Sequence, residues 1–305
     1  MPKRLIVTAD DFGLAVPVNE AVELGHRNGI LTSASLMVTA AAAADAVERA
    51  RRLPRLGVGL HLVLVNGRPA LPPEQIPDLV GSDGRFLDDA FRAGVRIYLS
   101  ARARAQAEAE IRAQLAAFRD TGLRLDHVDG HRHFHMHPTV QRILVRLAPE
   151  FGIAAVRVPQ EPFSPIWRAS REQPVRRSLA CLLLRGRTSA MKRRLGRAGI
   201  RFNDAILGLA DSGKMRPERV RRLLSALPDG TTELYVHAAT RRWSEPDPLS
   251  ASYAPEAEYA ALIDPEIKAW LGTSGVALAT FGDLTDRPRD SATPAAAQIL
   301  SGTRS

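Results

Sequence analysis

The sequence predicts an α/β fold, a distorted (β/α) barrel of TIM type with about seven parallel strands. Short apolar runs of strand length alternate with longer stretches of helical periodicity, and this alternation is typical of βαβ units that build a parallel sheet. The units follow one another without an internal repeat, and the 305 residues exceed the roughly 250 that one such barrel needs. A doubly wound open sheet is the alternative that the same alternation allows.

Seven segments have the length and apolar content of strands. They are residues 4–9, 31–38, 56–62, 123–131, 154–158, 232–238 and 276–281. The helices between them carry boundary signals, since Pro17 can open one that stops at Asn28-Gly29 and Pro138 can open another. Residues 101–120 form a strong helix, whereas residues 66–86 are rich in proline and glycine, which indicates a long binding loop or lid.

One segment carries nearly all of the excess positive charge. Residues 164–201 contain eleven Lys or Arg and one Glu, whereas the whole chain has a net charge of +9. We therefore expect one domain over residues 1–286 with a basic helical insertion near 164–201, followed by a disordered tail at 287–305. Because the basicity is confined to one segment, we expect no nucleic-acid partner.

Cysteine content and hydropathy indicate where the protein works. The single cysteine, Cys181, excludes a disulfide framework and a cysteine-based zinc site. The apolar stretch at the N-terminus is too short for a signal peptide, and no stretch is long enough to span a bilayer. We therefore expect a cytoplasmic protein, which the basic segment could bring to the inner face of the membrane.

Polar side chains collect at the carboxyl ends of four predicted strands, the end that carries the active site in β/α barrels. They are Asp10 and Asp11 at the first strand, His61 at the third, Asp129 and His131 at the fourth, and His237 at the sixth. Their coincidence on four separate strands is the main sequence evidence for a catalytic site.

Two histidines and a carboxylate with open coordination positions suit a hydrolytic metal ion, which polarises a carbonyl and lowers the pKa of bound water from ~16 to about 7. Asp11, His61 and His131 could supply these ligands to one divalent ion. Such a donor set favours Zn²⁺, with Mg²⁺ as the alternative. Asp10 would then act as general base and His237 as the acid that protonates the leaving group.

Simpler roles exist for some of these residues. Asp10 and Asp11 could cap the following helix, and His61 could be a hydrogen-bonded core histidine. His26 lies on a predicted helix and is expected to be structural.

Five histidines lie between residues 127 and 137, and in an extended strand they would share one face. They cannot all bind one ion, so the others are expected to contact substrate, orient ligands or be solvated. His131 and His135 are four residues apart, as on a metal-binding helix, but Gly130 and Pro138 argue against a helix there.

Three motifs together resemble the YdjC-like carbohydrate deacetylases, which include chitooligosaccharide deacetylase. The motifs are Thr8-Ala9-Asp10-Asp11-Phe12-Gly13, Gly59-Leu60-His61 and Asp129-Gly130-His131-Arg132-His133-Phe134-His135. The resemblance extends from Lys3 to about Leu284. It implies a distorted β/α barrel that removes N-acetyl groups from amino sugars with one divalent metal, with Asp11, His61 and His131 as ligands and Asp10 as the base.

The chain departs from the family pattern at two places. His237 stands where the family has a late histidine usually followed by proline, but Ala238 follows it here. The common Asp-Ser-His-His-His pattern is altered to Asp129-Gly130-His131-Arg132-His133, so we expect Arg132 to change substrate contacts. The expected substrate-binding residues are Asp129, His133, His135 and Arg157.

The segment from Ile166 to Asp204 resembles the hopanoid-biosynthesis-associated branch of the family. That resemblance implies deacetylation of an N-acetylglucosaminyl hopanoid lipid to its glucosamine form. The basic segment would then lie on an anionic membrane surface, with roughly 1 kcal/mol from each basic residue near it. A solvated helical arm or a homodimer contact would explain the segment equally well.

Other functions use parts of the same pattern. A chitooligosaccharide deacetylase would have the same ligands, as would a metal-dependent amidohydrolase or phosphoesterase, although amidohydrolases usually carry His-x-His on the first strand. A non-enzymatic metal-binding protein would account for the histidine run but not for Asp10, Asp11 and His61. A nucleic-acid-binding protein would account for the basic segment but leaves the histidines without a role.

Overall fold

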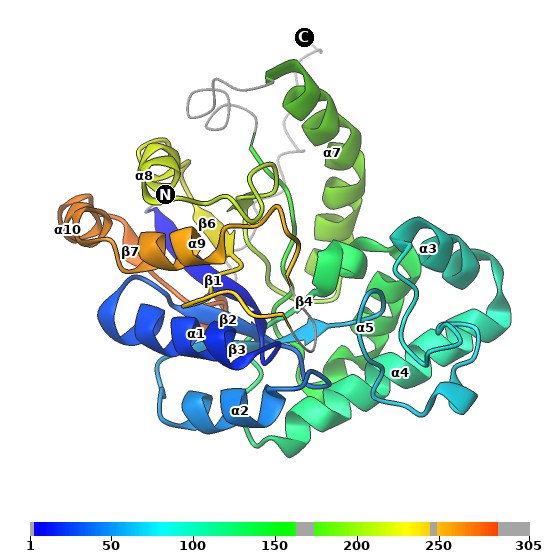
Figure 1. Cartoon of the computed structure of the whole chain (residues 1–305). Helices are drawn as coiled ribbons and strands as arrows, with labels where there is room; N and C mark the ends of the chain where they lie inside the picture. The colour runs from blue at the N-terminus through cyan, green and yellow to red at the C-terminus, as the bar shows by residue number, and fades with distance from the viewer. Residues whose placement is uncertain (1–2, 163–173, 245–248, 286–305) are drawn as a thin grey trace, which may run out of the picture.

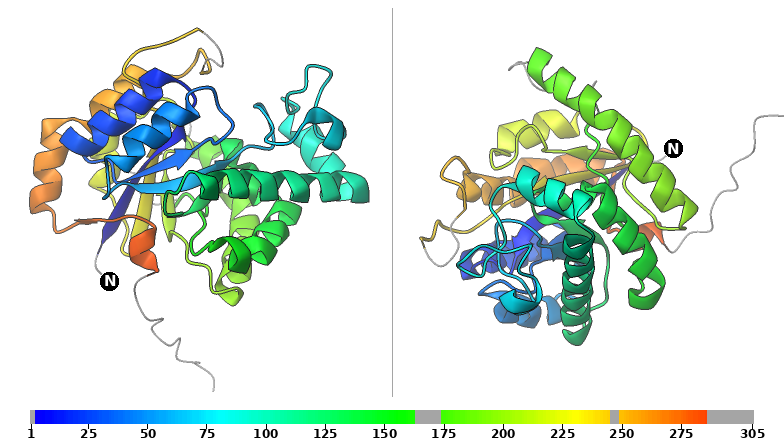
Figure 2. Two further views of the ribbon diagram at one scale, coloured as in Figure 1. Left: turned by 90° about the horizontal axis from the view of Figure 1, so that it is seen from below. Right: turned by 90° about the vertical axis from the view of Figure 1, so that its right-hand side faces the viewer.

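The computed structural model describes residues 3–162, 174–244 and 249–285, and the side chains of all of these except 174–183. Seven parallel strands form one curled sheet, and helices pack around its outside (Figure 1, Figure 2). The strands are β1 (Arg4–Phe12), β2 (Ser33–Leu36), β3 (Gly57–Leu62), β4 (Val128–Gly130), β5 (Ala205–Leu207), β6 (Thr231–Val236) and β7 (Ala277–Leu278).

The strand order is that of a barrel opened at one place. Along the sheet the order is β4-β3-β2-β1-β6-β5, so β1 pairs with both β2 and β6, and β4 and β5 are the terminal strands. The short β7 pairs with the beginning of β1. A doubly wound sheet would reverse its order at an internal switch point, which this sheet does not do. The predicted parallel α/β fold is confirmed, but the sheet is a half-barrel and does not close.

The opening coincides with a predicted strand, residues 154–158, that does not form. Residues 155 and 156 make only single bridges to the neighbouring segments. The backbone N–H and C=O of Val158 bond to the side chain of Asn203, at 2.7 and 2.9 Å, instead of to a strand. Because an amide side chain occupies these backbone groups, strand pairing cannot continue. The fifth strand is β5, which the sequence did not predict.

The helices follow their sequence signals closely. They are α1 (Val16–Asn28), α2 (Ala43–Arg51), α3 (Ala90–Leu99), α4 (Ala101–Asp120), α5 (Pro138–Phe151), α7 (Pro174–Arg197), α8 (Pro217–Leu224), α9 (Pro255–Leu262) and α10 (Pro265–Thr273). The predicted boundaries are confirmed at both ends of α4, at the end of α1 and at Pro138, while α3, α8, α9 and α10 were not predicted. Within the described ranges no helix has the length and apolar content to cross a bilayer.

Two predicted regions are described only in part or not at all. Helix α7 lies within the basic segment, but residues 163–173 of that segment lie outside the described residues. The predicted tail at 287–305 also lies outside them. The predicted loop at 66–86 contains the short 3₁₀ turn η1 (Pro73–Gln75) and is anchored to α4, where the carboxylate of Glu110 accepts the backbone N–H groups of Ala70 and Leu71.

The concave side of the sheet is a column of polar side chains rather than the branched apolar layers usual in β/α barrels. Some of these residues contact one another across strands that are not neighbours, as Ser35 of β2 does with Asp129 of β4, and all of them are buried. They are Thr8, Asp10, Ser33, Ser35, His61, Asp126, His127, Asp129, Arg157 and Glu233. Two glycines of β3 make room for them, because a Cβ on Gly57 would lie 2.7 Å from Asp126 and one on Gly59 would lie 2.4 Å from the ring of His127.

Candidate active site

β1 presents two adjacent aspartates to the concave side of the sheet. Neighbouring residues of a regular strand point to opposite faces, but the pairing of β1 with β2 is irregular between Ala9 and Phe12. Asp11 also has a left-handed φ of 62°. This bulge lets Asp10 and Asp11 both contact residues of the concave side. The alternative role in helix capping is wrong for α1, whose N-cap is Ala15 and which has no side-chain cap.

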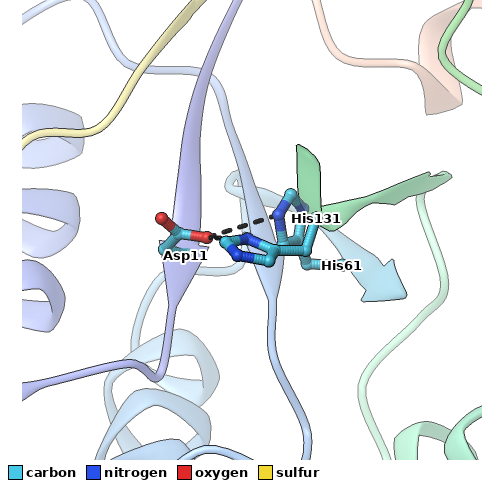
Figure 3. Close-up of side chains that lie close together, drawn as sticks. All are labelled: Asp11, His61 and His131. Carbon is cyan, nitrogen blue, oxygen red and sulfur yellow. Dashed lines mark hydrogen bonds and ion pairs between the residues drawn. The ribbon is translucent and has the colours of Figure 1, made fainter. Parts of the chain in front are cut away.

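Three of the predicted site residues converge from three strand ends (Figure 3). One carboxylate oxygen of Asp11 lies 3.3 Å from Nε2 of His61 and 3.1 Å from Nδ1 of His131. His61 lies on β3, and His131 directly follows β4. Asp11 and His61 are 2% and 1% exposed, and His131 is partly exposed, so the cluster opens to solvent on the side of His131.

The donor set fits a divalent ion. One carboxylate oxygen and two imidazole nitrogens lie within 4.8 Å of one another, which is the chemistry that Zn²⁺ sites use. Burial alone would raise the pKa of Asp11, but the charge and hydrogen bond of His131 and the hydrogen bond of His61 hold it well below its usual value. Burial alone would lower the pKa of His61, but Asp129 and Asp11 raise it well above its usual value. A metal would therefore replace a proton at this cluster.

A second cluster, formed by Asp10, His61 and Asp129, has similar spacing. It is a poorer cation site, because the guanidinium of Arg157 already lies against both of its carboxylates, at 2.7 Å from Asp10 and 2.6 Å from Asp129. The Asp11 cluster has no such cation beside it in the contacts of the described residues, so it is the better candidate.

Arg157 is a fully buried guanidinium shared by three carboxylates. Its two Nη atoms bond the two oxygens of Asp10 at 2.8 and 2.7 Å, and Nη1 also contacts Asp129. Its Nε and Nη2 bond Glu233 at 3.0 and 2.8 Å. Burial alone would lower the pKa of Arg157, but the three carboxylates raise it well above its ordinary value. With all of its nitrogens engaged and none of its surface exposed, this side chain ties β1, β4 and β6 together.

Asp129 orients the ring of His61. Its Oδ1 lies 2.8 Å from Nδ1 of His61, while Nε2 of the same ring faces Asp11. Since a carboxylate only accepts, Nδ1 carries the proton and Nε2 is directed toward the candidate metal position. Asp129 is 0% exposed.

A chain of buried hydrogen bonds continues from Asp129 through the column. The Ser35 hydroxyl donates to Oδ2 of Asp129 at 2.8 Å, and Ser35 Oγ lies 3.1 Å from Nε2 of His127. Nδ1 of His127 in turn lies 3.1 Å from Asp126, and its ring stacks on Phe281. The chain fixes the position of Asp129 and, through it, the ring of His61.

His237 directly follows β6, as predicted, and faces an aromatic wall of the site. Its ring centroid lies 5.5 Å from that of Tyr235 and 4.9 Å from that of Tyr253. Its backbone N–H donates to the buried Glu258 at 2.5 Å, and its Nδ1 is buried without a hydrogen-bond partner in the described part of the chain. Tyr235 connects His237 to the site, because the same ring lies 5.2 Å from the guanidinium carbon of Arg157.

The histidine run does not share one extended face, so that expectation is wrong. The chain turns directly after β4 into the 3₁₀ segment η2 (His131–Met136), and Arg132 and His133 have φ of 52° and 55°. A left-handed pair of residues reverses the chain locally, which sends successive side chains in different directions. The alternative of a metal-binding α-helix with His131 and His135 as a pair does not form either.

The remaining histidines of the run therefore have separate roles. Nε2 of His133 lies 3.3 Å from the hydroxyl of Tyr235. His135 is fully buried and donates from Nε2 to the backbone carbonyl of Arg157 at 3.1 Å, and burial together with the charge of Arg157 lowers its pKa to about 4. His137 caps α5, since its Nδ1 accepts the backbone N–H of Thr139.

Several residues of the site were not predicted, among them Glu233, Tyr235 and Ser35. Glu233 had a usable signal, because a charged residue inside a predicted buried strand requires a buried partner. Ser35 had none, since a serine in a strand usually has no more than a local hydrogen bond.

The profile of the family described as YdjC-like protein matches residues 4–273 of the chain. This chain is a YdjC-like protein. A protein from Mus musculus named carbohydrate deacetylase is 34% identical to it, over 93% of this chain and 96% of the mouse protein. A carbohydrate deacetylase from Geobacillus stearothermophilus is 32% identical, over 92% of this chain and 98% of its own length.

The YdjC-like fold of this chain also has a relative of known structure. The crystal structure of an Enterococcus faecalis protein with a proposed role in cellobiose-phosphate cleavage superimposes with a TM-score of 0.72. The alignment covers 93% of this chain and all of the other, at 24% identity. At that identity the likeness shows the fold alone.

Proposed function

We propose that this YdjC-like protein is a metal-dependent carbohydrate N-deacetylase, a hydrolase that removes the acetyl group from an N-acetylglucosamine unit. The observation that carries the proposal is the three-ligand cluster of Asp11, His61 and His131 with a second carboxylate, Asp10, outside it. A hydrolytic site needs both a ligand set and a free base. The relatives named carbohydrate deacetylases support the substrate class.

Asp11, His61 and His131 would hold one divalent ion, with Zn²⁺ favoured by the two imidazoles and Mg²⁺ as the alternative. When bound, the ion would polarise the acetamide carbonyl and lower the pKa of the attacking water. Asp129 holds His61 in the tautomer that this requires.

Asp10 is the proposed general base. Arg157 fixes its carboxylate with two hydrogen bonds, and each oxygen keeps a further lone pair for a proton. One of its oxygens lies within 4.8 Å of a ring nitrogen of His61, so the base stands beside the ligand cluster. We therefore propose that Asp129, His135 and Arg157, expected to bind substrate, position other residues instead, since all three are fully buried.

His237 is the proposed general acid that protonates the departing amine. It enters the site from β6, across the sheet from β3 and β4, and its unpartnered Nδ1 is available for a proton. His133, which is partly exposed and lies against Tyr235, remains the proposed sugar contact among the histidines of the run.

The substrate that we propose is the N-acetylglucosamine unit of a glycosylated hopanoid lipid, on the resemblance of residues 166–204 to the hopanoid-associated branch. The basic helix α7, with Arg185, Arg187 and Arg193 exposed, would then contact an anionic membrane surface. A chitooligosaccharide is the alternative substrate, and a homodimer contact is the alternative role of α7.

Acetate release tests the proposal. The purified protein is stripped with a chelator and assayed on N-acetylglucosaminyl hopanoid and on diacetylchitobiose, before and after addition of Zn²⁺ or Mg²⁺. We expect activity to be lost with the chelator and restored by one metal. Asp10→Asn should lower turnover at least about 10²-fold while metal binding stays intact. His131→Ala should lose both turnover and metal binding.

His26→Ala is the matched control, because His26 is a half-buried histidine of α1, outside the site, whose ring bonds the backbone carbonyl of Leu31. Metal-independent turnover would contradict the ligand assignment, and near-normal turnover of Asp10→Asn would contradict the base. Activity on diacetylchitobiose alone would refute the hopanoid substrate but not the deacetylase.

A further inference from the structure

Helix α3 exposes an apolar face that nothing in the described structure covers. Phe91, Val95, Tyr98 and Leu99 are 81%, 40%, 56% and 73% exposed. Their spacing places them on one side of the helix, while Ala93, Gly94 and Ile97 on the opposite side are buried against the protein. An open apolar groove runs along the exposed face, lined by Phe91, Arg92, Val95, Arg96, Leu99 and Ser100.

Exposed apolar side chains are concentrated on α3. Eight large apolar side chains are exposed among the described residues, and four of them lie on these ten residues. Single exposed apolar residues need no explanation, but a contiguous patch indicates a binding surface.

The apolar face of α3 borders the candidate active site. The ring of Tyr98 lies 6.3 Å from that of His137, which directly follows η2, and Gly94 packs against the same ring. The guanidinium of Arg132 in η2 bonds the backbone carbonyl of Asp88, just before α3. Whatever binds α3 therefore lies next to the segment that carries His131.

The charge around this face is positive. From Asp88 to Arg104 the chain has four arginines and two acids, Asp88 and Asp89, which stand directly before α3. Arg92 and Arg102 are exposed, Asp78 pairs with Arg102 at 3.2 Å, and Asp89 accepts the backbone N–H of Arg92 as the N-cap of α3. Helix α7 lies on the same side of the molecule (Figure 2, right) and adds its exposed arginines. An apolar strip flanked by arginines is complementary to an anionic lipid surface.

A second copy of the chain is a poorer occupant. A two-fold interface would place the same net-positive face against itself, where Asp78 offsets only part of the charge, through Arg102 at 3.2 Å. Phospholipid headgroups supply that negative charge, and acyl chains supply the apolar environment for Phe91 and Leu99.

We propose that α3 docks this protein on an anionic phospholipid bilayer, with Phe91, Val95, Tyr98 and Leu99 inserted at the boundary of headgroups and acyl chains. Arg92 and Arg102 contact lipid phosphates at the edge of the inserted strip. The docking surface is separate from α7 and lies outside the catalytic machinery, so the inference does not depend on deacetylase activity.

Vesicle co-sedimentation of the full chain tests this, with vesicles of phosphatidylcholine alone and of phosphatidylcholine with phosphatidylglycerol. We expect binding to the anionic vesicles that weakens with salt. The double variant Phe91→Ser/Leu99→Ser should bind the anionic vesicles at least about tenfold more weakly. A tenfold change in affinity corresponds to about 1.4 kcal/mol, and burying one Phe or Leu side chain contributes more than that. Tyr98→Trp should give a blue-shifted emission when anionic vesicles are added.

Val16→Ser/Leu24→Ser is the matched control, because it removes two exposed apolar side chains, 41% and 36% exposed, from α1. It should bind vesicles like the wild type. Failure of the wild type to bind anionic vesicles, or equal binding by the α3 variant, would overturn the proposal. A concentration-dependent dimer that the α3 variant dissociates, without vesicle binding, would show instead that this face joins two copies.

Deacetylation of diacetylchitobiose separates this inference from the proposed function. The α3 variant should retain wild-type turnover on that soluble sugar while losing vesicle binding. A protein that binds vesicles through α3 but releases no acetate would leave the docking surface standing and refute the deacetylase.

Discussion

Replacing Arg157 with methionine removes the cation at the centre of the polar column while keeping a side chain of similar length. The wild-type guanidinium donates to Asp10, Asp129 and Glu233 at distances between 2.6 and 3.0 Å, and all four residues are 0–2% exposed. The variant would leave three buried carboxylates without their shared partner.

The expected cost is large. Breaking one buried ion pair by removing a partner costs about 3–5 kcal/mol, and here three carboxylates lose the same partner. A domain is stable by roughly 5–15 kcal/mol in total. We therefore expect Arg157→Met to lose at least about 3 kcal/mol of unfolding free energy at pH 7.

The loss should shrink as the pH falls. Without the guanidinium, burial raises the pKa of the carboxylates above their unfolded value of about 4. A carboxyl group whose pKa is higher in the folded protein than in the unfolded protein favours folding below its unfolded pKa. That stabilisation is lost as the pH rises through the folded pKa. The difference between wild type and variant should therefore be greatest near pH 7 and smaller near pH 5.

Urea unfolding at several pH values measures these differences. The control is Arg49→Met, which removes an arginine bonded to Asp45 and Glu23 at the partly exposed surface between α1 and α2, and should cost about 1 kcal/mol or less. Adding Glu233→Gln to Arg157→Met should recover part of the loss. A cost below about 1 kcal/mol, independent of pH, would refute the idea that Arg157 compensates the buried carboxylates.

Three further predictions follow from the same column. Gly59→Ala should cost about 1–3 kcal/mol in urea unfolding, because the added methyl would overlap the ring of His127. Ser35→Ala should weaken Zn²⁺ binding, measured by competition with a chelating dye, by about tenfold, since it releases the carboxylate that orients His61. Asp126→Asn should cost about 1–3 kcal/mol near pH 7. Burial alone would raise the pKa of Asp126, but hydrogen bonds from His127 and the backbone lower it. The ionised Asp126 carboxylate therefore contributes to the free energy of unfolding above about pH 4, and this contribution is lost as the pH falls further.

Controls and contrary outcomes for these three are direct. Gly272→Ala, on α10 with open space around it, should be neutral or stabilising, and equal costs for the two glycines would contradict the overlap. Thr232→Val removes a buried hydroxyl that has no hydrogen bond in the described structure, and should leave Zn²⁺ affinity unchanged. Unaltered affinity in Ser35→Ala would show that the chain does not orient the ligand. A cost of Asp126→Asn that stays constant to pH 3 would contradict its ionised role.

The sequence by itself determined features that depend on neighbouring residues. Pro17 lies in the first turn of α1, Asn28 ends that helix, and residues 101–120 form α4, because caps, proline and helical periodicity act over a few residues. The convergence of Asp11, His61 and His131 was also predictable, since parallel strands place their carboxyl ends at one edge.

Tertiary structure decided what depends on distant partners. Arg157 was expected to bind substrate, and only the structure shows that it bonds Asp10, 147 residues away, and Glu233, 76 residues away. Residues 154–158 had the composition of a strand, yet the Asn203 side chain takes the backbone groups that pairing needs. The local sequence pattern determines where helices and strands tend to form. A buried charge or an unpaired backbone N–H or C=O group needs a partner, and that partner is decided only when segments far apart in the sequence pack together.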